Sequence, residues 1–194
     1  MADVNFSAKS VPAAAAPVTR ADAGSDAPGG GRGSHAEPAW DLIELLFFAY
    51  RDFVGDADTV LAEFGFGRAH HRVLHFVNRN PGIKVADLLD ILKITKQSLG
   101  RVLKQLVDEG YVIQKEGPSD RRQRLLYVTP KGEALALQLA GLQSVRIARA
   151  LKDAGGNVHD AARRFLAAMV DPGGRERVLR LIAHGGDGSR KSRP

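Results

Sequence analysis

The fold is decided by TKQSLGRVLKQLVDEG at residues 95–110, followed by DRRQR at residues 120–124. The first segment has the pattern of an amphipathic helix that Thr95 caps at its start and Gly110 ends. The second segment lies between two runs rich in β-branched and large apolar residues, 111–113 and 125–128. We therefore expect a short helix followed by a two-stranded hairpin whose tip is basic.

The expected helix, residues 96–109, has one apolar face and one polar face. At about 100° per residue, the apolar side chains fall within about 80° of Leu99, whereas the polar ones fall between about 140° and 200° from it. The apolar set is Val102, Leu103, Leu106 and Val107, and the polar set is Gln97, Arg101 and Lys104. We expect the apolar face to be buried. The polar face is either a binding surface or an ordinary solvated surface.

A short helix over residues 85–92 precedes this one, and two short helices joined by a tight turn form a helix-turn-helix. Such a helix can enter the major groove of DNA, and a basic hairpin can reach the backbone or minor groove beside it. Glutamine suits adenine, arginine suits guanine, and lysines and first-turn hydroxyls suit phosphates. The predicted DNA-binding residues are Thr95, Lys96, Gln97, Ser98, Arg101, Lys104, Asp120, Arg121, Arg122 and Arg124.

Two residues of this stretch have two interpretations each. Gly100 costs helix stability, so it serves either a close approach of the backbone to DNA or the relief of crowding against another helix. Asp120 should repel phosphate. It either holds an arginine guanidinium in a fixed pose or only starts the turn.

The chain before this stretch predicts two helices. The first begins at Pro38, and Phe47 and Phe48 widen its apolar stripe beyond what one packing partner needs. This surplus suggests burial on two sides, with a second subunit as one candidate partner. We expect Gly55 to break this helix, and a second helix to span residues 68–78.

The chain after the hairpin predicts three more helical segments. Thr129 caps a long helix that Pro130 begins and a Gly-Gly pair at residues 155–156 ends. Asn157 caps the next helix, and the Asp-Pro pair at residues 171–172 begins the last.

Composition narrows the function classes. The 194 residues carry a formal net charge of +6, which favours polyanionic partners, and contain no cysteine, which excludes disulfides, cysteine zinc sites and thiol redox chemistry. No apolar run reaches about 18 residues, so we expect no membrane-spanning helix.

Residues 1–36 and 185–194 are poor in large apolar side chains and are predicted to be a disordered extension and a disordered basic tail. Two prolines interrupt the apolar N-terminal segment, which disfavours a signal peptide.

His70, His71 and His75 form a cluster that leaves three interpretations open. His71 and His75 lie one helical turn apart, a usable metal-ligand spacing, but a site would need further ligands. The alternatives are the wall of an effector pocket, together with Phe47 and Tyr50, and simple packing. We expect no cofactor, and there is neither a nucleophile-base signature nor a complete metal motif, so we expect no enzyme.

The run from Arg68 through Leu139 resembles the winged-helix regulators of the MarR (multiple antibiotic resistance regulator) family, and within it a subgroup called PetP-like. The resemblance is most specific in the Asp-Arg-Arg segment at 120–122 and in the Thr-x-x-Gly segment at 129–132. Lys84 departs from the family, which often has a threonine there to cap the next helix.

The resemblance implies a mainly α (α+β) winged helix-turn-helix protein that forms a cytoplasmic homodimer. Residues 37–66 and 131–184 would form dimerisation helices around a DNA-binding region at 67–130. Helix 96–109 would enter the major groove of a pseudo-palindromic operator. The wing, residues 116–124, would reach the minor groove, with Asp120 orienting Arg122. A repressor released by a small-molecule effector is the expected function. The alternatives are an architectural or protein-interaction module and a His-based metal- or haem-responsive regulator.

Overall fold

The computed structural model describes residues 37–187, so most of the two segments predicted to be disordered lies outside the described residues. The expected tail at 185–194 begins within a helix, because the last helix continues to Asp187. The elements are α1 (Trp40–Glu63), α2 (Arg68–Arg79), β1 (Ile83–Lys84), α3 (Val85–Leu92), α4 (Lys96–Asp108), β2 (Val112–Glu116), β3 (Arg124–Val128), α5 (Pro130–Asp153), α6 (His159–Met169) and α7 (Pro172–Asp187). This mainly helical chain with a small sheet confirms the predicted winged helix-turn-helix fold class.

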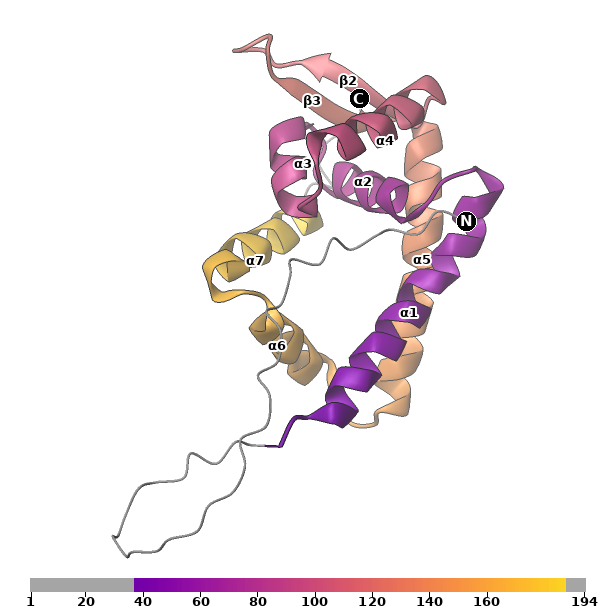
Figure 1. Ribbon diagram of the computed structural model, residues 1–194, viewed down its shortest axis with the longest axis vertical. Coiled ribbons are helices and arrows are strands. Elements are labelled where there is room, and N and C mark those ends of the chain that lie inside the picture. The colour runs from indigo at the N-terminus through magenta and orange to yellow at the C-terminus, as the bar shows by residue number, and fades with distance from the viewer. Residues whose placement is uncertain (1–36, 188–194) are drawn as a thin grey trace, which may run out of the picture. The chain divides into compact units, whose positions relative to one another are not determined.

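The strands form an antiparallel sheet in the order β1-β3-β2 within the described residues. β2 and β3 are the predicted hairpin, paired from Val112 opposite Val128 to Glu116 opposite Arg124. Ile83 of β1 pairs with Leu126 of β3, a contact between segments far apart in the sequence. The hairpin projects from one end of the fold, next to α3 and α4 (Figure 1).

One hydrophobic core holds the helix-turn-helix and the sheet together. Its fully buried side chains come from α1 to α5 and from the strands: Leu61, Leu74, Leu88, Leu99, Leu106, Val112, Leu126 and Leu139. Burying a side chain of this size stabilises a fold by about 1.5–3 kcal/mol. The core therefore fixes α4 rigidly against the base of the hairpin.

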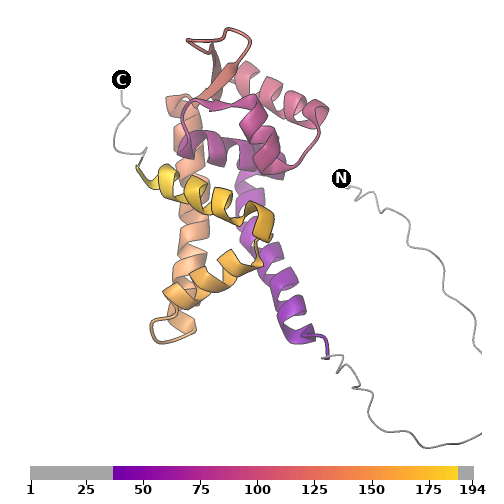
Figure 2. The ribbon, with the colours of Figure 1, turned by 90° about the vertical axis from the view of Figure 1, so that its left-hand side faces the viewer.

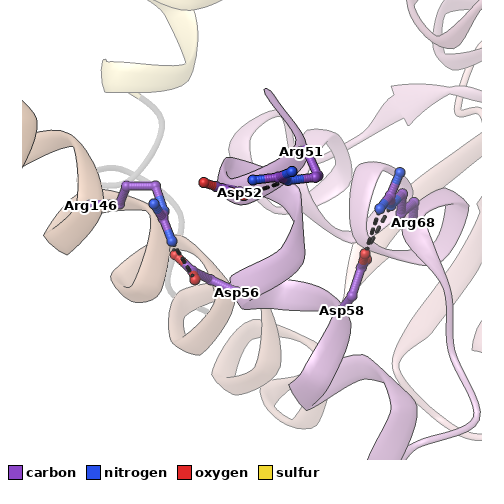
Figure 3. Close-up of polar contacts among 6 residues, drawn as sticks. All are labelled: Arg51, Asp52, Asp56, Asp58, Arg68 and Arg146. Carbon is purple, nitrogen blue, oxygen red and sulfur yellow. Dashed lines mark hydrogen bonds and ion pairs between the residues drawn. The ribbon is translucent and has the colours of Figure 1, made fainter. Parts of the chain in front are cut away.

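α1 and α5 lie side by side and are joined by an ion pair (Figures 1 and 2). Arg146 on α5 donates two hydrogen bonds of 2.7 Å to the carboxylate of Asp56 on α1, and Asp58 pairs with Arg68 on α2 (Figure 3). The Arg146 hydrogen bonds lower the pKa of Asp56. The predicted break at Gly55 is wrong, because α1 continues through this position as one helix.

α6 and α7 fold back along the molecule from the end of α5 (Figure 2). The predicted cap of α6 is wrong by one residue, since Val158 occupies the N-cap position instead of Asn157. α6 has no buried residue, and its apolar side chains Phe165, Leu166 and Met169 are exposed. Among the described helices, none is long and apolar enough to cross a membrane.

Candidate nucleic-acid interface

α4 begins after Thr95 and ends before Gly110, the two residues that the sequence predicts to bound this helix. Thr95 Oγ1 accepts a hydrogen bond from the Ser98 backbone N–H at 3.1 Å, which confirms the N-cap. Gly110 has a φ of 76°, a left-handed conformation that favours glycine. The backbone N–H groups of Gly110 and Tyr111 donate back to the carbonyls of Val107 and Leu106. The length and direction of α4 are therefore set locally.

The two faces of α4 lie as predicted. Leu99, Val102, Leu103 and Leu106 are buried. All the predicted binding residues of the helix are exposed: Lys96, Gln97, Ser98, Arg101 and Lys104, with Thr95 before them. Lys104 forms an ion pair with Asp108, one turn later on the same helix. Within residues 37–187 the Arg101 guanidinium has no hydrogen bond or ion pair to protein, so it is available for a ligand.

The turn of the wing has a defined backbone. The Gly117 N–H donates to the Gln123 carbonyl, and the Gln123 N–H donates to the Asp120 carbonyl, both at 3.0 Å. Gly117 is buried, and a Cβ there would lie 2.8 Å from the Asp120 carbonyl oxygen. Asp120 Oδ1 accepts a hydrogen bond of 3.0 Å from the backbone N–H of Arg122. The expectation that Asp120 holds a guanidinium is therefore corrected: in this structure it fixes the turn.

The wing arginines differ in their contacts. Arg124 donates to Glu116 Oε1 at 3.2 Å, and the other carboxylate oxygen of Glu116 lies 4.0 Å from Arg121 Nε. In the described residues the exposed Arg122 guanidinium has no such partner. Glu116, which contacts two of these arginines, is not among the residues that the sequence predicted. Its position directly opposite Arg124 comes from the hairpin register, for which the sequence of this long turn gives no signal.

α4 and the wing line one groove of about 1040 Å³. Lys104 and Gly100 lie on its helix side, and Arg122 and Arg124 on its wing side. Lys84, exposed at the end of β1, lines the same groove and was also missed by sequence reasoning. As the departure from the family pattern predicts, its side chain gives α3 no cap hydrogen bond. The remaining predicted residues lie outside the lining: Thr95, Lys96, Gln97, Ser98, Arg101, Asp120 and Arg121.

Gly100 faces open space. A Cβ built at this position would have no atom within 4 Å outside the local helix backbone. Crowding against another helix of this chain is therefore excluded as the reason for the glycine. Of the two interpretations, the close approach of a ligand to the α4 backbone is the one that this geometry favours.

The histidines have separate positions. The His70 ring stacks on Phe66 with a centroid distance of 4.7 Å, and its Nε2 lies 2.9 Å from Gln105 Oε1, so it ties α2 to α4. Its Nδ1 accepts a hydrogen bond from the backbone N–H of Gly67. His71 is buried, which lowers its pKa. Across residues 37–187, no group of three or more His, Asp or Glu side chains is placed to hold a metal ion, so the His71–His75 pair lacks a third ligand there.

Of the residues predicted to form an effector pocket, only His75 lines either of the two cavities described for residues 37–187. Phe47 and Tyr50 are exposed on α1, while His75 lines a second cavity of about 890 Å³ between α2, α3 and α7. That cavity also carries charged residues, including Asp90 and Arg177, which form an ion pair. The grouping of Phe47, Tyr50, His70 and His71 with His75 therefore stays a prediction.

Comparison with known proteins agrees with this geometry. The sequence model that describes the MarR family matches residues 64–123 of this chain. The chain is 46% identical over 130 residues to the HTH-type transcriptional regulator PetP of Rhodobacter capsulatus, covering 67% of this chain and 78% of PetP. It is also 30% identical over 89 residues to a putative transcriptional regulatory protein for the hcr operon of Thauera aromatica, covering 45% of this chain and 52% of that protein.

Solved structures share the fold at low sequence identity. Streptococcus pneumoniae FabT in complex with DNA gives a TM-score of 0.61 at 13% identity, covering 68% of this chain and 94% of FabT. A MarR variant from E. coli complexed with operator DNA gives a TM-score of 0.53 at 23% identity, covering 68% of this chain and 94% of the MarR chain. Together with the identity to PetP, these findings establish that the chain belongs to the MarR family of transcriptional regulators, which are DNA-binding proteins and not enzymes.

Proposed function

We propose that this chain is a homodimeric repressor that binds a pseudo-palindromic operator, with α4 in the major groove and the wing at the minor groove. One observation carries the proposal: cationic side chains of α4 and of the wing line a single groove. Lys104 comes from the helix, and Arg122, whose guanidinium has no protein partner among the described residues, comes from the hairpin. A duplex that spans this groove would contact both elements at once.

The proposed contacts with DNA are of two kinds: some position the protein on the phosphate backbone, and others recognise bases. Thr95 and Ser98 lie at the N-terminus of α4, where hydroxyls and free backbone N–H groups favour a phosphate. Arg101 is exposed and unpaired within the described chain, so its guanidinium can donate two hydrogen bonds to a guanine. The open surface at Gly100 lets the α4 backbone approach the duplex.

The homodimer is supported by apolar side chains that this single chain leaves uncovered. They lie on α1 and on the helices after the wing: Trp40, Leu42, Leu45, Phe47, Phe48, Tyr50, Leu137, Val145, Ile147, Phe165, Leu166, Met169 and Ile182. Large apolar side chains exposed in this number are typical of a surface that a partner covers. A two-fold symmetric contact would cover it and would present two α4 helices to two operator half-sites.

Repression and effector release complete the proposal. A dimer bound across an operator would block other proteins from that DNA. A small molecule in the cavity between α2, α3 and α7 would change the contact between the helix-turn-helix and the C-terminal helix. PetP is a transcriptional regulator, and two of the similar solved structures are complexes with DNA or operator DNA, which agrees with this function.

The test is a fluorescence anisotropy titration of the purified protein with a duplex from its own promoter and with a scrambled duplex of equal length. We expect tighter binding to the promoter and a steep loss of affinity with salt. Arg101→Ala should cost about 1–3 kcal/mol on the promoter and relax the base preference. Lys104→Ala should weaken both duplexes alike and reduce the salt slope by about 1.

Two results would contradict the proposal. Equal affinity for the promoter and the scrambled duplex at moderate salt would favour the architectural alternative. A monomer at micromolar concentration in light scattering would exclude the homodimer.

A further inference from the structure

Besides Asp120, the wing contains a second carboxylate, Glu116, although a carboxylate repels DNA phosphates. Glu116 ends β2 and lies directly opposite Arg124, which begins β3. Its Oε1 accepts a hydrogen bond from Arg124 at 3.2 Å, and its Oε2 lies 4.0 Å from Nε of Arg121. One carboxylate is thus shared by two of the three wing arginines.

The backbone holds this arrangement in place. The Gly117 N–H donates to the Gln123 carbonyl, closing the hairpin next to the Glu116–Arg124 pair. Arg124 also donates to the carbonyl of Arg121 at 3.3 Å, so the guanidinium bridges both sides of the turn. The folded hairpin therefore places the Glu116 carboxylate within reach of both arginines.

The third arginine of the wing, Arg122, has different contacts. The Arg122 backbone N–H donates to Asp120, which orients the turn, while its guanidinium has no protein partner in the described part of the chain. The wing therefore has one free guanidinium and two that are compensated by Glu116. Phosphate contacts carry no sequence information, whereas an arginine in a narrow minor groove reads the shape of the DNA.

We propose that Glu116 is a specificity-determining residue, which holds Arg121 and Arg124 away from DNA phosphates and leaves Arg122 as the wing residue that reads the groove. This inference rests on the proposed DNA-binding function. A phosphate that approaches the base of the wing meets a carboxylate and arginines that are already paired. Glu116 thereby weakens backbone binding that any sequence could provide, and weakens operator binding less, because base contacts fix the register of the operator complex.

The experiment measures Glu116→Gln on the full chain against two duplexes of equal length. One is enriched from a random pool by the wild-type protein, and the other is its scrambled counterpart. We expect the affinity of E116Q for the scrambled duplex to rise roughly three- to ten-fold, with a salt slope steeper by about 1, chiefly because Arg124, the arginine that donates a hydrogen bond to Glu116, becomes free to contact a phosphate. The affinity for the enriched duplex should rise less, so the ratio of the two affinities falls.

Two further variants isolate the cause. Glu176→Gln removes a carboxylate that pairs with an arginine, Arg180, on α7 instead of on the wing, and should leave both affinities unchanged. Arg124→Gln combined with E116Q should remove most of the gain on the scrambled duplex, because the released arginine is then absent. Far-ultraviolet circular dichroism of each variant verifies that the fold is intact.

The outcomes separate this inference from the proposed function. If the wild type enriches no sequence and binds every duplex alike, the proposed function fails. If the wild type is specific but E116Q leaves the salt slope and the scrambled-duplex affinity unchanged, or raises both affinities equally, the role of Glu116 in specificity is overturned.

Discussion

Gly132 on α5 lies against the backbone of Tyr111 so closely that a Cβ on it would overlap the Tyr111 carbonyl oxygen. The same carbonyl accepts a hydrogen bond from the Thr129 N–H at 3.0 Å, and Thr129 Oγ1 donates to the Gly110 carbonyl at 2.7 Å. Thr129 Oγ1 also caps α5 by accepting from the Gly132 N–H. The Thr-x-x-Gly segment thus fastens the start of α5 to the junction between α4 and β2.

Gly132→Ala should therefore destabilise the protein. The methyl group meets backbone, which cannot rotate away as a side chain can, so we expect a loss of about 2 kcal/mol or more in the free energy of unfolding. Urea denaturation followed by circular dichroism measures it. Gly141→Ala on the same helix is the control, because a Cβ there meets nothing within 4 Å. A G132A protein as stable as G141A would show that this close contact does not constrain the fold.

Gly100→Ala should have opposite effects on stability and on DNA binding. Alanine fits the open space at this position, and the better helix former should stabilise the free protein by about 0.5–1 kcal/mol. The added methyl group projects into the groove between α4 and the wing, so affinity for the promoter should fall. Thermal unfolding and anisotropy measure the two effects. G141A should give the stability gain without the loss of affinity. Unchanged DNA binding in G100A would leave the glycine without a role at the duplex.

The elements that depend on local signals were predictable from the sequence. α4 is set by the Thr95 cap, by its apolar period and by Gly110, all within one short segment. The hairpin strands and the proline start of α5 follow from equally local patterns. For the same reason the exposed faces of α4 and the wing could be assigned residue by residue before their positions were known.

The features that depend on distant contacts were not predictable. β1 has only Ile83 and Lys84, and it exists because these residues pair with β3 about forty positions later. The role of Glu116 depends on the hairpin register, which the long turn leaves undetermined in the sequence. α1 crosses Gly55 because it packs along α5, where Asp56 meets Arg146, and tertiary contacts of this kind override a weak helix propensity.

Acidification should destabilise the protein through His71. Burial lowers the pKa of this imidazole below its usual value of 6.5, although the nearby Asp58 carboxylate opposes the shift. The unfolded chain then binds a proton that the folded state resists, so stability is retained above pH 6.5 and falls as the pH drops below it. His71→Gln should reduce the fall of the thermal-unfolding midpoint between pH 7.5 and pH 5.5, and the part that remains is expected from His75, whose pKa burial also lowers. An equally steep decline in H71Q would assign the pH dependence to other groups.

Asp56→Asn should loosen the contact between α1 and α5. Arg146 donates two hydrogen bonds to the Asp56 carboxylate across these helices, whereas the Asp52 carboxylate forms its ion pair with its neighbour Arg51 on the same helix (Figure 3). At pH 7 we therefore expect D56N to unfold at a lower temperature than wild type, and Asp52→Asn, the matched control, to differ less.

The dependence of this effect on pH follows from the direction of the pKa shift. The pKa of Asp56 is lowered by Arg146, so the ion pair stabilises the fold above the usual aspartate pKa of 3.8, and the benefit is lost as the pH falls through the lowered value. The unfolding temperatures of D56N and wild type, measured by calorimetry, should thus converge in acid. A difference that persists undiminished at low pH would show that Asp56 stabilises the helices through packing and not through its charge.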